Sequence, residues 1–311
     1  MNKKFAALLL IGIIASGLIY THPAYAHNFG GDESASWLSK VSEIKTEVAN
    51  VAKHVGQKDV IDYYADALGE YWNSNDTKEM GEKNALLAQE IPSAINATLA
   101  DARSGNQNMV NDDVTKLGGY LDESVPVRVD QSKLDNSTVQ ALAVTFVIKE
   151  ALEKYADALN STVDLNDMSQ MGSMSGMSDN NMSGSGMSSG SMSNMAMGTI
   201  VNANAYENSV ALATAAQQMF SDVASKNPNI SSNSKISDGF TKLIQDLNGK
   251  ADANTIMNDV HVGIHPPLIA AYNLQTVPEP AVPEFPLPIV LIIISIAGVV
   301  AATRFKSHLG F

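Results

Sequence analysis

The chain has 311 residues, no cysteine, and 33 acidic against 20 basic residues, which gives a formal net charge of −13. The lack of cysteine excludes disulfides, thiolate metal sites and a cysteine nucleophile. The negative charge argues against nucleic acid or an anionic membrane surface as a partner, and favours attraction of cations.

Residues 1–26 have the three parts of a secretory signal peptide. Two lysines precede an apolar stretch over residues 5–19, and Ala24-Tyr25-Ala26 forms an A-x-A cleavage site. Cleavage there predicts a mature chain that begins at His27. The α-amino group and imidazole of His27 offer two nitrogen donors to a metal, most naturally Cu(II), although a lone histidine is more simply explained as incidental.

Residues 27–166 are predicted to form an N-terminal helical bundle. Apolar residues recur there at steps of three and four, which is typical of amphipathic helices. The pattern predicts helices over residues 36–55, 60–72, 78–102, 111–121 and 138–161. Pro92 predicts a kink or break in the third helix, and short loops indicate antiparallel neighbours.

An acidic stripe follows His54 at steps of three or four, formed by Asp59, Asp62, Asp66 and Glu70. Such a stripe is most often a solvated helix face. A hard-cation site is the alternative, since carboxylates favour Ca, Mg, Mn or iron over Cu(I).

Residues 167–198 have the sequence DMSQMGSMSGMSDNNMSGSGMSSGSMSNMAMG. Nine of the 14 methionines lie here: Met168, Met171, Met174, Met177, Met182, Met187, Met192, Met195 and Met197. The segment has no periodic apolar face and too much Gly and Ser for a helix, so a disordered segment is predicted. Thioether sulfur is a soft ligand that selects Cu(I), and a flexible chain can wrap several sulfurs around one ion. An inert Ser/Gly linker is the competing interpretation.

Residues 199–275 are predicted to form a second helical region, with helices over 204–224, 236–247 and 252–264. His261 and His265 stand four apart at the end of the last helix, before Pro266 and Pro267, so both imidazoles share one face as a metal site requires. Capping of the last carbonyls of the helix is an equally weighted alternative.

Two similarities link the regions on either side of the methionine segment. Tyr64-Ala-Asp-Ala-Leu68 recurs as Tyr155-Ala-Asp-Ala-Leu159, and residues 91–112 are patterned like residues 236–259. A duplicated bundle interrupted by an insertion is one interpretation. The other is that amphipathic helices resemble one another.

Residues 205–268, with Leu247-Asn-Gly-Lys-Ala-Asp-Ala253 before the last helix, resemble the extracytoplasmic helical domain of high-affinity iron permeases. That family's transmembrane Arg-Glu-x-x-Glu motif is absent, as is the multi-span permease. The resemblance therefore implies a helical bundle that handles a metal outside the cell, and no permease activity.

The C-terminal end has three parts: a Pro-rich linker over 276–286, an uncharged apolar stretch over 287–303 and a basic tail over 304–311. Seventeen apolar residues are enough for a membrane span, and the basic tail should stay cytoplasmic. With Val-Pro-Glu-Phe-Pro at 282–286, this end resembles the PEFG-CTERM sorting signal of archaeal surface proteins. The resemblance implies a sortase-type processing enzyme as partner. Pro286 replaces the family's Gly, so permanent anchoring by the helix is the alternative.

No catalytic motif is present: there is no G-x-S-x-G, H-E-x-x-H, P-loop or Gly-rich dinucleotide turn. The sequence thus predicts a non-enzymatic, all-α cell-surface protein, anchored by a C-terminal helix, whose methionine segment binds copper as a buffer, scavenger or donor. The alternatives are an extracytoplasmic iron-binding module that uses histidines and carboxylates, and a structural surface protein with an inert linker.

Overall fold

The computed structural model describes residues 31–161, 164–166 and 198–275, which contain helices and no strand. The all-α prediction is confirmed for these residues. The described residues from 31 to 274 belong to one compact unit. The predicted methionine segment, signal peptide and C-terminal anchor lie outside the described residues, apart from Gly198.

The described elements are α-helices, together with one π-helical turn, η1, near the end of the described chain. They are α2 (Glu33–Lys53), α3 (Lys58–Tyr71), α4 (Ser74–Lys83), α5 (Leu87–Ser104), α6 (Gln107–Arg128), α7 (Gln131–Leu134), α8 (Ser137–Leu159), α10 (Ala203–Lys226), α11 (Asn233–Asn248), α12 (Ala253–Asn258), η1 (Asp259–Ile264) and α13 (His265–Tyr272).

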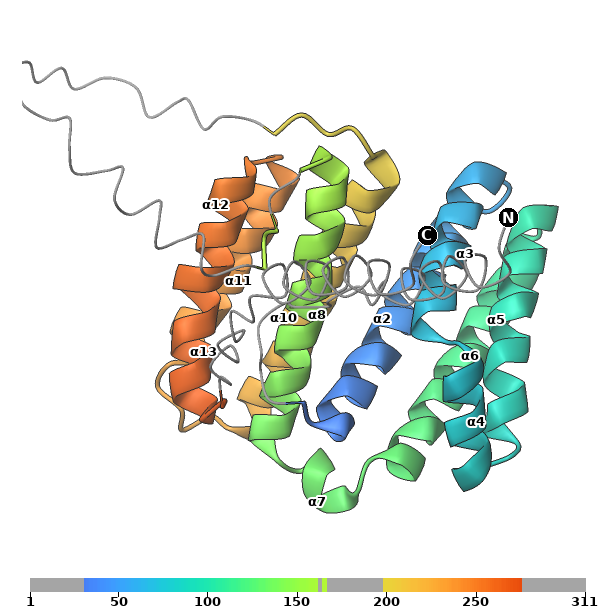
Figure 1. Ribbon diagram of the computed structural model, residues 1–311, viewed down its shortest axis with the longest axis horizontal. Coiled ribbons are helices and arrows are strands. Elements are labelled where there is room, and N and C mark those ends of the chain that lie inside the picture. Colours follow the sequence, from blue (N-terminus) through green and yellow to red (C-terminus); the bar gives the residue numbers. More distant parts are fainter. Residues whose placement is uncertain (1–30, 162–163, 167–197, 276–311) are drawn as a thin grey trace, which may run out of the picture. The chain divides into compact units, whose positions relative to one another are not determined.

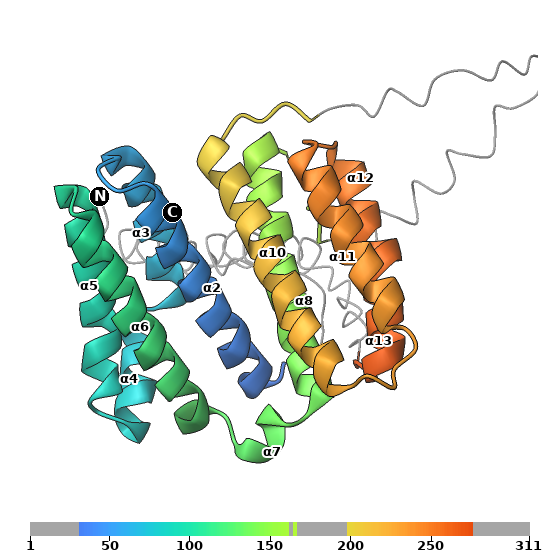
Figure 2. The same cartoon turned by 180° about the vertical axis from the view of Figure 1, so that it is seen from behind.

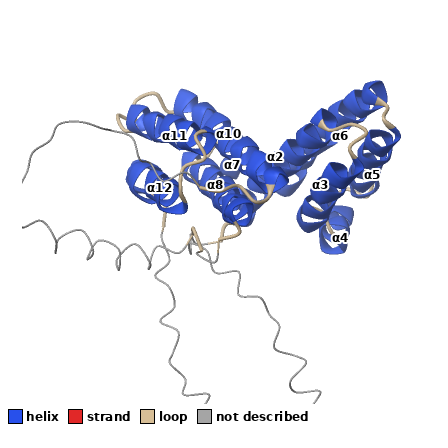
Figure 3. Cartoon of the chain, turned by 90° about the horizontal axis from the view of Figure 1, so that it is seen from above, coloured by secondary structure: helices blue, strands red, loops and turns tan. Residues whose placement is uncertain are grey.

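Helix α2 lies at the centre of the packing. It contacts α3, α5 and α6 on one side and α8 and α10 on the other, as Figure 1 and the view from behind in Figure 2 show. Seen from above, α3 to α6 lie to one side of α2, and α8 and α10 to α12 to the other (Figure 3). Both faces of α2 are therefore largely covered.

Helices α2 to α6 pack around one apolar core, to which one face of α2 contributes. Ile44, Val48 and Val51 of α2 join buried residues of α3 to α6 in this core. In the second group, the Phe220 ring stacks on Phe240 at 5.6 Å and meets the Tyr272 ring edge-on at 6.2 Å. Burial of such aromatic side chains dominates core energetics, so these contacts fix α10, α11 and α13 together.

Capping residues explain where several helices begin and end. Asp32 caps α2 by accepting hydrogen bonds from the backbone N–H groups of Ser34 and Ala35, at 2.9 and 3.2 Å. Gly105 ends α5 with φ of 83°, a conformation that favours glycine.

The predicted helix over residues 78–102 is two helices, and the break does not fall at Pro92. Asn84 interrupts the helix instead, because its side-chain oxygen accepts from the N–H groups of Leu86 and Leu87, at 3.1 and 3.2 Å, and so starts α5. Pro92 lies within α5. Of the predicted kink or break at Pro92, the break was wrong, since a proline in the second turn removes only one backbone hydrogen bond. The kink stays a prediction.

Helix α8 precedes the methionine segment and α10 follows it, yet the two helices pack directly against each other. The backbone N–H of Val201 also donates to the Ala158 carbonyl at 2.7 Å, which ties the start of α10 to the end of α8. Within the described ranges, no helix is long and apolar enough to cross a membrane. The predicted span over 287–303 lies outside those ranges and stays a prediction.

Candidate functional site

The His261 and His265 pair lies inside a continuous helical run and not at its end. His261 is in η1 and His265 begins α13, which continues to Tyr272. Pro266 and Pro267 occupy the first turn of α13, where a missing N–H does little harm. The expectation that these prolines end the helix was wrong, because α13 continues through them to Tyr272. A π-helical turn before a proline pair accommodates the disrupted backbone bonding.

The structure brings the two imidazoles together as predicted. Their ring centroids are 5.3 Å apart in an edge-to-face arrangement, and the residues are only 2% and 1% exposed. The Nε2 atom of His261 lies 2.8 Å from the carbonyl oxygen of Leu165. Because a carbonyl only accepts, Nε2 is the donor, and the neutral ring then carries its lone pair on Nδ1. Metal-binding histidines commonly hold their other nitrogen in this way.

Leu165 and Asn166, which immediately precede the methionine segment, are both 1% exposed. The side-chain amide of Asn166 donates to the Lys149 carbonyl at 3.5 Å and to the Glu153 carboxylate at 3.3 Å. At the other end, the N–H of Gly198 donates to the Lys250 carbonyl at 2.8 Å. Both ends of the methionine segment are therefore fixed to the helical unit, and one of them touches His261.

The nine predicted methionine ligands and His27 lie outside the described residues. Across the described ranges, no group of three or more His, Asp or Glu side chains is arranged to hold a metal ion.

The Asp259 carboxylate, two residues before His261 in the sequence, forms an ion pair with a lysine. Its Oδ1 accepts from the Lys242 ammonium at 2.6 Å, and the same ammonium donates to Asp246 at 2.6 Å. Burial raises the pKa of Asp259 to about 6, against the lowering effect of Lys242.

The acidic stripe on α3 is a solvated face, since Asp59, Asp62, Asp66 and Glu70 are all exposed. The Arg103 guanidinium lies 2.7 Å from Asp62, and the Lys154 ammonium lies 3.7 Å from Glu70. His54 lies apart from the stripe, with Nε2 2.7 Å from Glu207 of α10.

A second polar region, which sequence analysis missed, runs along α2 inside the packing. Ser39, Glu43, Glu47 and Asn50 are all buried on one side of this helix. These four residues are called the α2 seam below. Asn208 of α10 donates to Glu47 Oε1 at 2.7 Å, and the other Glu47 oxygen has no hydrogen-bond partner.

Burial dominates the electrostatics of the α2 seam. It raises the pKa of Glu43 to about 8, with the charge of Glu150 adding to the effect and Lys40 opposing it. It also raises the pKa of Glu47 to about 7, against the hydrogen bond from Asn208 and the charge of Lys154. A carboxyl that loses water favours its neutral form.

Helix α8 supplies the charges that face the α2 seam. Lys154 lies 3.1 Å from Glu150 and 3.7 Å from Glu70 of α3, and Lys149 lies 3.6 Å from Glu153. The seam had one signal in the sequence: polar residues at steps of four, four and three along α2. That signal is easily missed, because the same residues read as the solvated face of an amphipathic helix.

A cavity of about 1450 Å³ lies along α2 and α10 and is separate from the histidine pair. None of its described lining residues belongs to η1 or α13. Small side chains such as Ala49, Ala211 and Ala215 line it together with surface charges such as Lys53 and Glu207.

No family model, no curated protein and no solved structure matches this chain. The resemblances to the iron-permease domain and to the PEFG-CTERM signal stay predictions.

Proposed function

We propose that this protein is an exported, surface-anchored copper-binding protein, a buffer, scavenger or donor of Cu(I), in which the methionine segment provides most of the ligands. The observation that carries the proposal is the 2.8 Å contact between His261 Nε2 and the Leu165 carbonyl, three residues before Met168. It supports a mixed site in which imidazole and thioether donors meet.

Chain geometry supports this meeting. Consecutive Cα atoms are about 3.8 Å apart, so the Cα of Met168 lies within about 11 Å of the Cα of Leu165. The Leu165 carbonyl is itself bonded to His261. The chain length therefore allows the first thioether of the segment to reach the buried pair of imidazoles.

The donor chemistry also favours copper. Thioethers and imidazoles together suit copper, whereas hard ions prefer carboxylates and water. The hydrogen bond to Leu165 orients the His261 ring and fixes its tautomer. Further sulfurs along the segment would each add a weak ligand at high effective concentration, which gives tight overall binding with labile individual contacts.

Anaerobic titration of the chain from residue 27 onward, with a Cu(I) competitor chelator, tests the proposal. We expect more than one Cu(I) per chain, without competition from Zn(II), which prefers imidazole and thiolate. Replacing Met168, Met171, Met174 and Met177 by leucine keeps the bulk and removes four sulfurs, so the stoichiometry should fall. The matched control is Met80→Leu, a buried methionine of α4.

Unchanged Cu(I) binding in the fourfold variant would refute the role of the methionines. A parallel titration with Fe(II) and Fe(III) addresses the alternative of an iron-binding module, and binding of neither metal would leave a structural surface protein as the function.

A further inference from the structure

A cavity of about 520 Å³ lies between the N-terminal half of α2 and the middle of α8. Its walls are one stripe of each helix, because the residues that line it recur at steps of three and four. The central lining residues are Ser36, Ser39 and Glu43 of α2 and Phe146, Lys149 and Glu150 of α8. Pockets for small organic molecules commonly measure about 300 to 1000 Å³, so this cavity is large enough for such a ligand.

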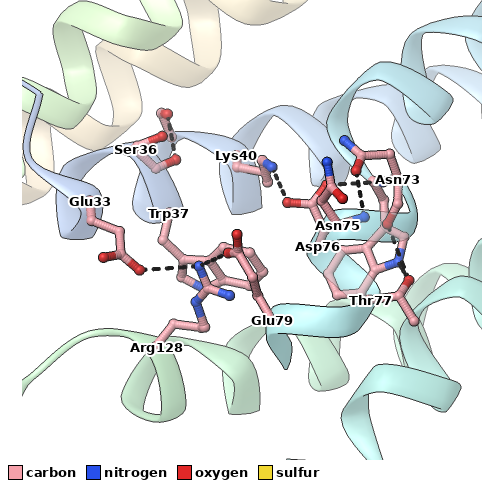
Figure 4. Close-up of polar contacts among 12 residues, drawn as sticks. Glu33, Ser36, Trp37, Lys40, Asn73, Asn75, Asp76, Thr77, Glu79 and Arg128 are labelled. Atoms are coloured by element: carbon pink, nitrogen blue, oxygen red, sulfur yellow. Dashed lines mark hydrogen bonds and ion pairs between the residues drawn. The ribbon is translucent and has the colours of Figure 1, made fainter. Parts of the chain in front are cut away.

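Most charged groups of this cavity already have partners. Asp32 caps α2 and also accepts from the Lys133 ammonium at 2.8 Å. Glu33 accepts from the Arg128 guanidinium at 3.3 Å (Figure 4). The two charged residues of the α8 wall form the ion pairs described above. These groups therefore place no unpaired charge in the cavity.

Glu43 is the exception among the charged residues of the lining. It is only 7% exposed, yet it has no hydrogen bond or ion pair with any described residue. Lys40, one turn earlier on α2, donates instead to the Asp76 carboxylate of α4, as Figure 4 shows. A buried carboxylate without a partner is costly, so the arrangement calls for a group that donates hydrogen bonds and carries positive charge.

The rest of the lining suits an organic cation. The Ser39 hydroxyl donates its proton to the Ser36 carbonyl at 2.9 Å, so the lone pairs of its oxygen are left to accept. The Phe146 ring supplies apolar surface for a hydrocarbon chain, and an aromatic face also attracts positive charge. A bare metal ion makes no use of such a surface, whereas an alkyl ammonium ion matches both the carboxylate and the ring.

We propose that this cavity binds a primary alkyl ammonium ion, whose N–H groups donate to the Glu43 carboxylate and whose hydrocarbon chain lies along Phe146. A primary ammonium has three N–H donors and no acceptor, which fits a site of carboxylate and hydroxyl oxygens. The net charge of −13 favours the approach of such a cation. The proposal rests on described residues alone and does not depend on copper binding.

Binding of the ammonium ion competes with protonation of Glu43. Burial, followed by the charge of Glu150, raises the pKa of Glu43 to about 8. The charged and titratable groups around this carboxyl are Lys40 and Glu47 of α2, Tyr71 of α3, and Lys149, Glu150 and Glu153 of α8. Without ligand, the carboxyl therefore holds a proton at neutral pH. The ligand displaces that proton, so affinity should rise by about tenfold from pH 7 to pH 9.

Isothermal titration calorimetry of the full chain in detergent with 1,5-diaminopentane tests the proposal. The amino groups of this probe resemble that of lysine, which titrates near about 10.4, so they stay charged over the range studied. We expect binding about tenfold tighter at pH 9 than at pH 7, with release of about one proton per bound ligand at pH 7. Titrations in buffers of different ionisation enthalpy measure that release.

Glu43→Gln keeps the volume of the side chain and removes the charge that the ligand needs. The variant should bind the diamine at least tenfold more weakly at pH 9 and lose the pH dependence. The matched control is Glu47→Gln, because Glu47 is equally buried one turn further along α2 and does not line the cavity. Its affinity at pH 9 should stay within about threefold of the wild type. Circular dichroism establishes that both variants are folded.

Tetramethylammonium, which carries the same charge without an N–H group, should bind at least tenfold more weakly than the diamine. Absence of diamine binding, an affinity that does not change between pH 7 and pH 9, or equal affinities of wild type and folded Glu43→Gln would each overturn the proposal. So would binding of Mg²⁺ in place of the diamine. The pH profile and proton release are measured on the wild type, so they decide the matter even if Glu43→Gln does not fold. Cu(I) stoichiometry is a separate measurement, so failure here is distinct from failure of copper binding.

Discussion

The two buried polar regions of this protein, the α2 seam and the histidine pair, differ in the atoms that they present. The seam offers carboxylate oxygens, and burial raises the pKa values of Glu43 and Glu47 toward neutrality. The pair offers imidazole nitrogens, with one ring oriented by the Leu165 carbonyl beside the start of the methionine segment. Hard oxygen donors and softer nitrogen donors thus occupy separate parts of one helical unit.

This separation indicates two different tasks. Protonated or ion-paired carboxyls in the α2 seam concern the stability of the packing around α2. Imidazoles are suited to binding a borderline metal, and the proposed function adds the thioethers of the methionine segment as soft ligands. Changes in the seam should therefore alter stability and its pH dependence, and changes at the histidine pair should alter metal affinity.

The largest expected effect is on the pH dependence of stability through Glu47. Its pKa is raised to about 7 in the folded chain, above its ordinary value near 4.5, by burial and by the charges of Glu150 and Glu70 against Asn208 and Lys154. The folded chain therefore holds this proton more tightly, and stability falls as pH rises from 4.5 to 7. We expect Glu47→Gln to remove a loss on the order of 3 kcal/mol across that range.

Urea unfolding of wild type and Glu47→Gln at pH 5 and pH 8 checks this expectation. The variant should gain stability over the wild type at pH 8 and not at pH 5. Parallel pH curves for the two proteins would show that Glu47 keeps an ordinary pKa.

The next effect concerns the hydrogen bond between α10 and the α2 seam. Asn208→Ala leaves Glu47 Oε1 buried without a donor, and we expect a loss of about 2 kcal/mol in unfolding free energy, larger at pH 8 when Glu47 is ionised. The matched control on the same helix is Thr214→Ala, because the exposed Thr214 hydroxyl bonds only to its own helix at Val210. Equal unfolding free energies for both variants would mean that the seam contact contributes nothing to stability.

A smaller effect is expected at the histidine pair. His265→Ala should weaken Cu(I) binding by about tenfold, equivalent to about 1.4 kcal/mol, because one imidazole is lost while the methionines stay. His54→Ala is the control, since His54 is committed to Glu207. Competition titrations measure both affinities, and equal affinities would exclude His265 as a ligand.

The smallest effect is expected from shortening residues 167–197 to twelve Gly and Ser residues. Asn166 and Gly198 are held by the helices, and the cost of closing a loop changes by only about 0.6 kcal/mol per doubling of its length. The apo protein should keep its helical content and change its unfolding free energy by less than about 1 kcal/mol. A collapse of the circular dichroism signal would show that the methionines belong to the core.

The sequence predicted the helices well because their apolar periodicity is strong. Two features escaped because a tertiary or local contact overrides the pattern. Asn84 breaks a helix by bonding to its own backbone neighbours, and the prolines after His265 fit into the first turn of α13. Periodicity alone contains neither effect.

For the candidate site, helical spacing was enough to predict that His261 and His265 share a face. It was not enough to predict the contact with Leu165, which is 96 residues away along the chain. Glu43 and Glu47 escaped for a related reason. Their burial arises because α2 is covered on both sides, by helices that come before and after the methionine segment.

X-ray absorption at the copper edge of the Cu(I)-loaded protein tests the central claim most directly, because it identifies the atoms bound to the metal. We predict neighbours that are mainly sulfur, with a nitrogen contribution that decreases in His265→Ala. In a chain without cysteine, sulfur neighbours can come only from methionine. Copper neighbours consisting of nitrogen and oxygen alone would contradict the account.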